Sequence, residues 1–451
     1  MHGLPTAQYD PGAIKQRIRA ARGPDAMGAL EVYLSSVFLN YARDVQTGIL
    51  TPSRVDSEIV REVPLRDPKA TLVAFAQSSP MGFMEALPPS SSEYTRLLRQ
   101  KREMEQMLAR GGWGQTVPAS SLKPGQSGQA VVALRNRLMA KGYMGRSASQ
   151  TYDAELQAAV QKFQENNGLV ADGVAGAATM EAINKGLADR LAQVLVAMER
   201  ERWINRPLGE RHIWVNLTDF SAEVRDRGVV TFKTRSVIGK AVSDRRSPEF
   251  SDEMDHMVIN PSWYVPRSIA TKEYLPQLKS NPYAVGHLEI TDSRGRVVNR
   301  AAVDFASYSA SSFPFNMRQP PSRSNALGLV KFMFPNKYNI YLHDTPAKNL
   351  FSREVRAFSH GCIRLNDPFD FAYTLLAAQT ADPEGFFQST LSTRQETRVD
   401  LVDPVPVHLV YRTAFTTATG EVHFRRDVYG RDARIWSALQ REGVTLRALR
   451  G

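Results

Sequence analysis

Residues 341–365, which read YLHDTPAKNLFSREVRAFSHGCIRL, hold the side chains on which the interpretation of this sequence depends. They include Cys362, the only cysteine of the 451-residue chain, together with His343 and His360. A lone cysteine forms no internal disulfide. A cysteine near a histidine can instead act as a nucleophile, because a base converts the thiol to the reactive thiolate. The pattern therefore indicates a cysteine nucleophile, with either histidine as its base.

A metal site is the alternative use of the same side chains. His343, Asp344, His360 and Cys362 all carry donor atoms that zinc accepts, but they lack the closely paired spacing of structural zinc ligands. We therefore expect no metal ion, and no other cofactor is indicated.

Length and charge limit the class of protein. A chain of 451 residues exceeds one ordinary core, so we expect several domains. The net charge of +11 favours an anionic partner. Because the arginines are spread along the chain and no nucleic-acid motif is present, the anionic bacterial envelope is a better candidate than nucleic acid. No run of about 18 apolar residues occurs, so we expect no membrane span.

Two half-motifs carry a family resemblance. Residues 359–365, SHGCIRL, resemble the signature of the L,D-transpeptidases, the YkuD-type family that cross-links peptidoglycan. Residues 341–346, YLHDTP, match the upstream half of that signature, in the family's order and at its separation. Residues 260–266, NPSWYVP, resemble the family's Asn-Pro-x-Trp-x-Val-Pro segment.

The resemblance implies catalytic roles. Cys362 is the nucleophile and His343 the general base, since the base of the family is the upstream histidine. His360 is a second histidine that orients the loop or binds substrate. The Asp344 carbonyl holds the tautomer of His343, while the backbone N–H groups of Gly361 and Cys362 form an oxyanion hole.

Five further residues complete the expected site. Ser359 flanks the nucleophile as a supporting residue. Arg364 and Arg356 neutralise carboxylates of the substrate, although either could equally anchor a loop. Trp263 and Tyr341 line the cleft, with core packing as the alternative for Tyr341.

The pattern along the chain predicts a multidomain α+β protein. Its catalytic domain is β-rich with a helical lid insertion, and it is preceded by a three-helix module that resembles a peptidoglycan-binding module and by a mainly helical scaffold. The expected divisions are a scaffold over 1–114, the module over 115–186, a connecting helix over 187–208, the catalytic domain over 209–405 with the lid at about 262–337, and a C-terminal strand and basic helix over 406–451 that return to the scaffold.

The activity implied by the resemblance is two-step acyl transfer. Cys362 takes the acyl group of a stem tetrapeptide with loss of D-alanine, and a second stem accepts it to form a 3→3 cross-link. Three alternatives stay open: transfer of the stem to an envelope protein, hydrolysis as an L,D-carboxypeptidase, and an inactive wall-binding scaffold. The expected partners are peptidoglycan stem peptides and glycan.

The expected location is the periplasm. Residues 1–5 lack the apolar segment of a signal peptide, so we expect a chain trimmed of its export signal. By resemblance we also expect carbapenems to acylate Cys362.

Overall fold

A computed structural model describes residues 2–447, so the last four residues of the predicted C-terminal segment lie outside the described part. At its centre a nine-stranded sheet closes on itself, because β2 pairs with both β1 and β3. The strand order is β10-β3-β11-β9-β8-β4-β12-β1-β2. The strands of this barrel are β1 (Arg211–Asn216), β2 (Ser221–Asp226), β3 (Val229–Gly239), β4 (Phe250–Ile259), β8 (Val330–Met333), β9 (Leu342–His343), β10 (Ala357–Ser359), β11 (Ile363–Leu365) and β12 (Thr397–Val410).

Alternating side chains fill the barrel. Ile213 and Val215 of β1, Leu342 of β9 and Ile363 of β11 are fully buried in one core. Two helices, α13 (Pro368–Leu376) and α14 (Pro383–Ser392), add Phe371 and other side chains to that core. Strand β9 is only two residues long, and a turn at residues 337–338 precedes it.

The insertion between β4 and β8, residues 260–329, forms a small body with its own core, which we call the lid. It contains β5 (Trp263–Tyr264), α11 (Arg267–Ile269), the π-helical turn η1 (Ala270–Tyr274), α12 (Leu275–Ser280), β6 (Glu289–Thr291), the 3₁₀ turns η2 (Arg300–Ala302) and η3 (Phe305–Ser307), and β7 (Asn316–Gln319). The predicted insertion extended to residue 337, but β8 pairs with β4 and belongs to the barrel.

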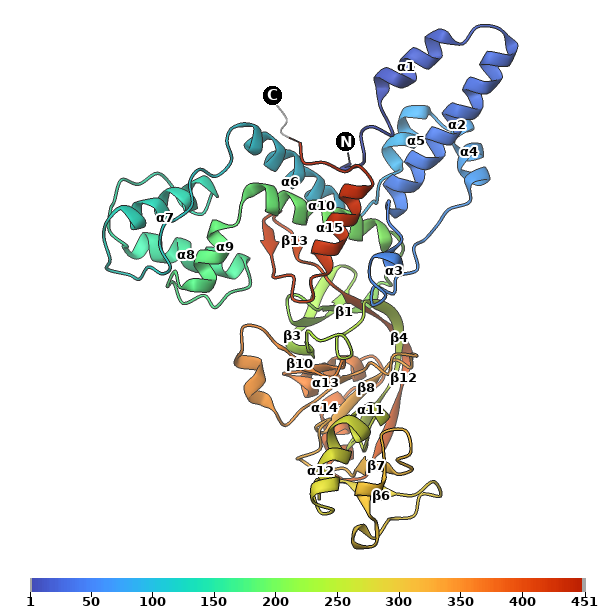
Figure 1. Ribbon diagram of the computed structural model, residues 1–451, viewed down its shortest axis with the longest axis vertical. Helices are drawn as coiled ribbons and strands as arrows, with labels where there is room; N and C mark the ends of the chain where they lie inside the picture. Colours follow the sequence, from blue (N-terminus) through green and yellow to red (C-terminus); the bar gives the residue numbers. More distant parts are fainter. Residues whose placement is uncertain (1, 448–451) are drawn as a thin grey trace.

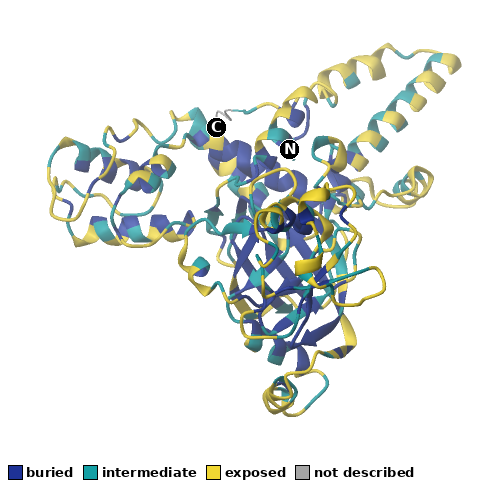
Figure 2. Cartoon of the chain, turned by 60° about the horizontal axis from the view of Figure 1, so that its bottom comes forward, coloured by how far each residue is buried: buried dark blue, intermediate teal, exposed yellow. Residues whose placement is uncertain are grey.

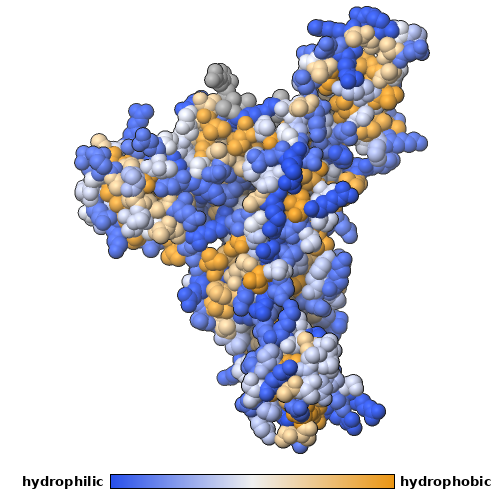
Figure 3. Space-filling model, viewed as in Figure 1, coloured by the Kyte–Doolittle hydropathy of each residue, from blue (hydrophilic) through white to orange (hydrophobic). Residues whose placement is uncertain are grey.

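Six helices precede the module: α1 (Pro11–Ala20), α2 (Pro24–Thr47), α3 (Pro52–Val55), α4 (Pro68–Ala76), α5 (Pro80–Ala86) and α6 (Ser92–Ala109). The first five begin with proline, whose fixed φ suits the first helical turn. The α1–α2 hairpin projects from the molecule as an arm (Figure 1), and its outward half is exposed (Figure 2). Hydrophobic residues gather on the arm over α2, α4 and α5 (Figure 3).

The three-helix module consists of α7 (Gln129–Ala140), α8 (Ala154–Asn166) and α9 (Ala177–Asn184). Its core contains the apolar side chains that recur at helical spacing, among them Leu134, Leu156, Val160 and Phe163. The module and the arm extend to opposite sides of the molecule, and the barrel and the lid lie below them (Figure 1).

Helix α10 (Leu187–Trp203) joins these parts. It is buried along almost its whole length and packs against α6 and the C-terminal helix α15 (Arg431–Arg441). The hairpin β13 (Ala414–Thr416) and β14 (Val422–Phe424) adds Ala414 and Phe424 to the same core, which also contains Tyr94 of α6.

A buried ion-pair network fixes the barrel to α10 and α15. Glu249, at the start of β4, is 2% exposed and accepts from Arg200 of α10 and from Arg431, 3.2 Å away. Arg200 also pairs with Asp432 at 3.0 Å. Buried charges of this kind are tolerated only because each one faces its opposite.

Replacing Glu249 with glutamine is expected to lower the free energy of unfolding by about 3–5 kcal/mol, because two buried guanidinium groups lose their common counter-charge. Urea unfolding followed by circular dichroism measures this loss. The matched control is Glu253→Gln on the same strand, where the side chain is exposed and the expected change is below about 0.5 kcal/mol. Equal losses in both variants would contradict the role of the network.

Candidate active site

The short strands β9 and β11 bring the predicted catalytic residues together. They run parallel, with Ile363 opposite Leu342 and Arg364 opposite His343. Since Ile363 and Leu342 point into the barrel core, the alternate residues point outward on the opposite face. Cys362 directly precedes β11 and faces the same outer side as Arg364.

A cleft of about 720 Å³ lies over that outer face, between the barrel and the lid. The predicted site residues that line it are Cys362, His343, His360, Ser359, Arg364, Trp263 and Tyr341. Gly361 and Asp344 lie behind them in the same loops, and Arg356 lies outside the cleft.

His343 is a neutral imidazole. Its Nδ1 lies against the Asp344 carbonyl oxygen, to which the Nδ1–H donates, so the lone pair is on Nε2. Burial first, and then the positive charge of Arg364, lowers the pKa of His343 to about 3. A base must be unprotonated to accept a proton, and His343 meets this condition at neutral pH.

Asp344 holds the backbone that orients His343. Its buried carboxylate accepts from the Leu329 N–H at 2.9 Å and from Lys348 Nζ at 2.8 Å. Gly328 makes this possible, since it has φ +65° and a Cβ there would lie 2.2 Å from the carboxylate. The Asp344 carbonyl oxygen lies against His343 Nδ1, the contact expected from sequence. The Asp344 carboxylate also holds the loop, and the motif did not indicate this.

Cys362 is a thiol at neutral pH. Loss of water around the sulfur raises its pKa to about 11, although the backbone N–H and the hydroxyl of Tyr341 favour the thiolate. Sγ lies 3.4 Å from the carbonyl oxygen of Asn339. A base is therefore needed during the attack itself, because no thiolate is formed in advance.

Ser359 and Gly361 shape the loop beneath the nucleophile. Ser359 Oγ donates to the Cys362 carbonyl at 2.6 Å and accepts from the Gly361 N–H at 3.1 Å. Gly361 has φ +121°, a conformation that side chains disfavour. Because the Gly361 N–H is already bonded, the Cys362 N–H is the member of the expected oxyanion hole that has no acceptor within residues 2–447.

His360 faces the lid. Its Nε2 lies 2.7 Å from Oε1 of Glu273 on η1, and the same oxygen accepts from Arg245 of the β3–β4 loop at 2.7 Å. Glu273 and Arg245 were missed from sequence, because no motif marks them and both come from segments distant in the chain.

The two arginines differ in position. Arg364 lies in the cleft, and its Nε has no hydrogen-bond partner in the described part of the chain. Arg356 instead donates to backbone carbonyls, including those of Ser236 and Phe220 at 3.1 Å each. These contacts are those of the loop anchor that the sequence left open as the alternative to substrate binding.

The two aromatic residues line the cleft. Trp263 packs edge-on against Tyr274 of the lid with ring centroids 6.4 Å apart. Tyr341 lies 5.6 Å from the ring of His343 and also contacts both the barrel and the lid cores. Core packing and cleft lining thus coincide at Tyr341.

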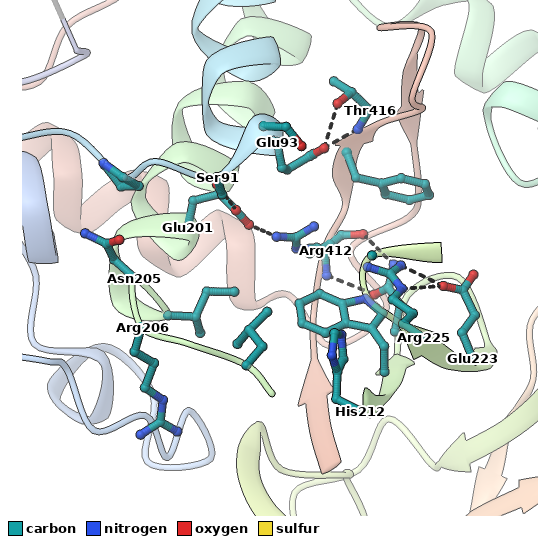
Figure 4. A pocket seen from close by; sticks show the side chains of 18 of the residues that line it. Ser91, Glu93, Glu201, Asn205, Arg206, His212, Glu223, Arg225, Arg412 and Thr416 are labelled. Carbon is teal, nitrogen blue, oxygen red and sulfur yellow. Dashed lines mark hydrogen bonds and ion pairs between the residues drawn. The ribbon is translucent and has the colours of Figure 1, made fainter. Parts of the chain in front are cut away.

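A second pocket of about 660 Å³ shares no lining residue with this cleft. It lies between α6, the end of α10 and the outer side of β1 and β2. The Arg412–Glu201 ion pair joins two of these segments, and Arg225 pairs with Glu223 within β2 (Figure 4). Residues 2–447 contain no group of three or more histidine, cysteine or acidic side chains placed to hold a metal ion. The same residues include no helix with the length and apolar character needed to cross a membrane.

Three regions of the chain match known families. Residues 210–403 match the YkuD family, described as the L,D-transpeptidase catalytic domain. Residues 127–183 match a family described as "Putative peptidoglycan binding domain", and residues 1–100 match the Scaffold domain. Residues 210–403 therefore match the L,D-transpeptidase catalytic domain, and they are preceded by a region that matches a peptidoglycan-binding domain.

A curated relative from Haemophilus influenzae, named "Putative L,D-transpeptidase", is 31% identical over 242 residues, which are 53% of this chain. The chain spans about half of that relative's length, 48%. Two solved L,D-transpeptidases were also found, each 16% identical. The one from Xylanimonas cellulosilytica has a TM-score of 0.19 and covers 66% of this chain and 100% of its own. The one from Stackebrandtia nassauensis has a TM-score of 0.23 and covers 65% and 96%. At these TM-scores the likeness supports no further conclusion.

The raised pKa of Cys362 predicts slow alkylation of the folded protein. A pKa of about 11 against the ordinary 9.0 leaves the native chain with far less thiolate than the unfolded chain at neutral or mildly alkaline pH. A more basic thiolate is intrinsically more nucleophilic, so the net expectation is iodoacetamide labelling about tenfold slower than in urea. The native rate should still rise above pH 9. A native rate that levels off near pH 8 or below would contradict the assignment.

Asp344→Ala is expected to slow the reaction of Cys362 with a carbapenem by about 10- to 100-fold, because the backbone that holds His343 loses both of its anchors. Intact-mass spectrometry at timed intervals measures the rate. Lys348→Ala is the matched control, since it removes one anchor and leaves the Leu329 contact. A rate for Asp344→Ala equal to that of the control would contradict the positioning role.

Proposed function

We propose that this chain is a cysteine acyltransferase that forms 3→3 cross-links in peptidoglycan. The observation that carries the proposal is the placement of Cys362 and a neutral His343 on one outer face of paired strands, beneath the lid. The match of residues 210–403 to the L,D-transpeptidase catalytic domain supports this acyl-transfer chemistry.

In the first half of the reaction the Nε2 of His343 accepts the thiol proton as Sγ of Cys362 attacks the carbonyl before the terminal D-alanine. The Cys362 N–H donates to the oxyanion that forms. His343 then gives its proton to the departing amine, D-alanine leaves and a thioester remains. Arg364, whose Nε has no hydrogen-bond partner among residues 2–447, supplies positive charge for a carboxylate of the stem.

In the second half an amine of another stem attacks the thioester. The lid covers the cleft and limits access of water, which favours transfer over hydrolysis. Transfer to an envelope protein uses the same chemistry with another amine.

We further propose that the protein acts on the cell wall in the periplasm, with the module of residues 127–183 holding peptidoglycan near the cleft. We also propose that the divisions expected from sequence are separate functional parts. These are the scaffold, the module, the connecting helix, the catalytic domain and the C-terminal segment.

Incubation with a disaccharide-tetrapeptide tests the proposal, with products identified by mass spectrometry. We expect a cross-linked dimer and released D-alanine from the wild-type chain, and neither from Cys362→Ala. A tripeptide without dimer would instead favour hydrolysis or a missing acceptor. The same products from Cys362→Ala would refute the assigned nucleophile.

A further inference from the structure

The acceptor amine in this reaction needs a base, and His360 is more open than His343 to an acceptor that enters the cleft from outside. His343 is 4% exposed, although it lines the cleft together with Cys362. A second stem peptide approaches from outside. The side chain of His360 is 34% exposed in the same cleft, two residues from Cys362.

Glu273 gives His360 the arrangement of a base. The carboxylate lies 2.7 Å from Nε2, which fixes the N–H on Nε2 and leaves the lone pair on Nδ1. Nδ1 has no hydrogen-bond partner among the described residues. Arg245 bonds the same carboxylate oxygen at 2.7 Å and so holds Glu273 in place from the barrel side.

We infer that His360, oriented by Glu273 of the lid, is the base that takes the proton of the acceptor amine in the second half of the reaction. This inference rests on the proposed cross-linking function. His360 would contact the reacting nitrogen and is thus a catalytic residue, whereas Glu273 is a positioning residue.

The step balances without any further reactant. The acceptor loses one proton to solvent and enters as a neutral amine. Its nitrogen forms the bond to the thioester carbon as Nδ1 of His360 takes a second proton. The carbon–sulfur bond then breaks, the new amide leaves, and the proton on His360 returns to the Cys362 thiolate.

The arrangement also couples the base to the position of the lid. Glu273 belongs to η1, so His360 has its carboxylate partner only while the lid is seated on the barrel. A neighbouring lid contact, Lys272 with Asp244 at 2.9 Å, closes the same rim without touching His360. A variant that breaks this contact is therefore a control that separates closure of the lid from proton transfer.

The test measures the two halves separately. Acyl-enzyme formation and D-alanine release from the disaccharide-tetrapeptide report the first half. Dimer formation, after fresh muropeptide is added to the isolated acyl-enzyme, reports the second half. For His360→Gln we expect acylation within about threefold of wild type and transfer slowed by about 100-fold or more.

Variants of the lid complete the test. Glu273→Gln should slow transfer and spare acylation, and Glu273→Asp should recover part of the transfer rate because it keeps a carboxylate. Lys272→Gln, which breaks the other rim contact, should keep the wild-type ratio of transfer to acylation. Hydroxylamine, a strong nucleophile that is neutral near physiological pH, should resolve the wild-type and His360→Gln acyl-enzymes at similar rates.

Several outcomes would overturn the inference. They are transfer by His360→Gln within about threefold of wild type, equal losses in both halves, an equal loss in Lys272→Gln, or slow resolution of the His360→Gln acyl-enzyme by hydroxylamine. If the wild-type chain forms no acyl-enzyme and releases no D-alanine, the proposed function itself fails, and this inference fails with it.

Discussion

The pairing of two very short parallel strands is the constraint on which the site depends. β9 and β11 place Leu342 and Ile363 in the barrel core, and the period of two in a strand then forces His343 and Arg364 to the outside. A shift of one residue in this pairing would turn His343 into the barrel core and turn the core side chains outward. The packing of the barrel therefore sets the geometry of the site, and the loop around Gly361 sets only the position of the nucleophile.

Most of the expected site residues lie close together in the chain, and the structure places them around one cleft. Seven of the ten expected site residues line one cleft. The same sequence did not reveal Glu273 or Arg245, which reach His360 from the lid and from the β3–β4 loop. Such contacts are created by tertiary structure, and a single carboxylate in a helical turn has no local pattern that distinguishes it. Proximity in sequence was also not sufficient for Arg356. Its place between the two half-motifs did not tell whether its guanidinium faced substrate or backbone carbonyls.

The fold was predictable where periodicity is strong. The helices of the module follow from apolar side chains at helical spacing, and these form its core. The limits of the lid were less accessible, because β8 follows a loop-rich stretch and only its pairing with β4 assigns it to the barrel. The pKa shifts of the site residues also could not be predicted from the sequence. Burial, rather than neighbouring charge, is the largest cause of the shifted pKa values of both His343 and Cys362.

The core around α10 has a consequence for the order of folding. It combines Ile59 and Tyr94 near the start of the chain with Ile435 and Val444 near its end. This core stays incomplete until the last residues are available, although the module can bury its own apolar side chains as soon as it emerges. Contacts so distant in sequence also form slowly. The core around α10 is thus completed only after nearly the whole chain has been synthesised.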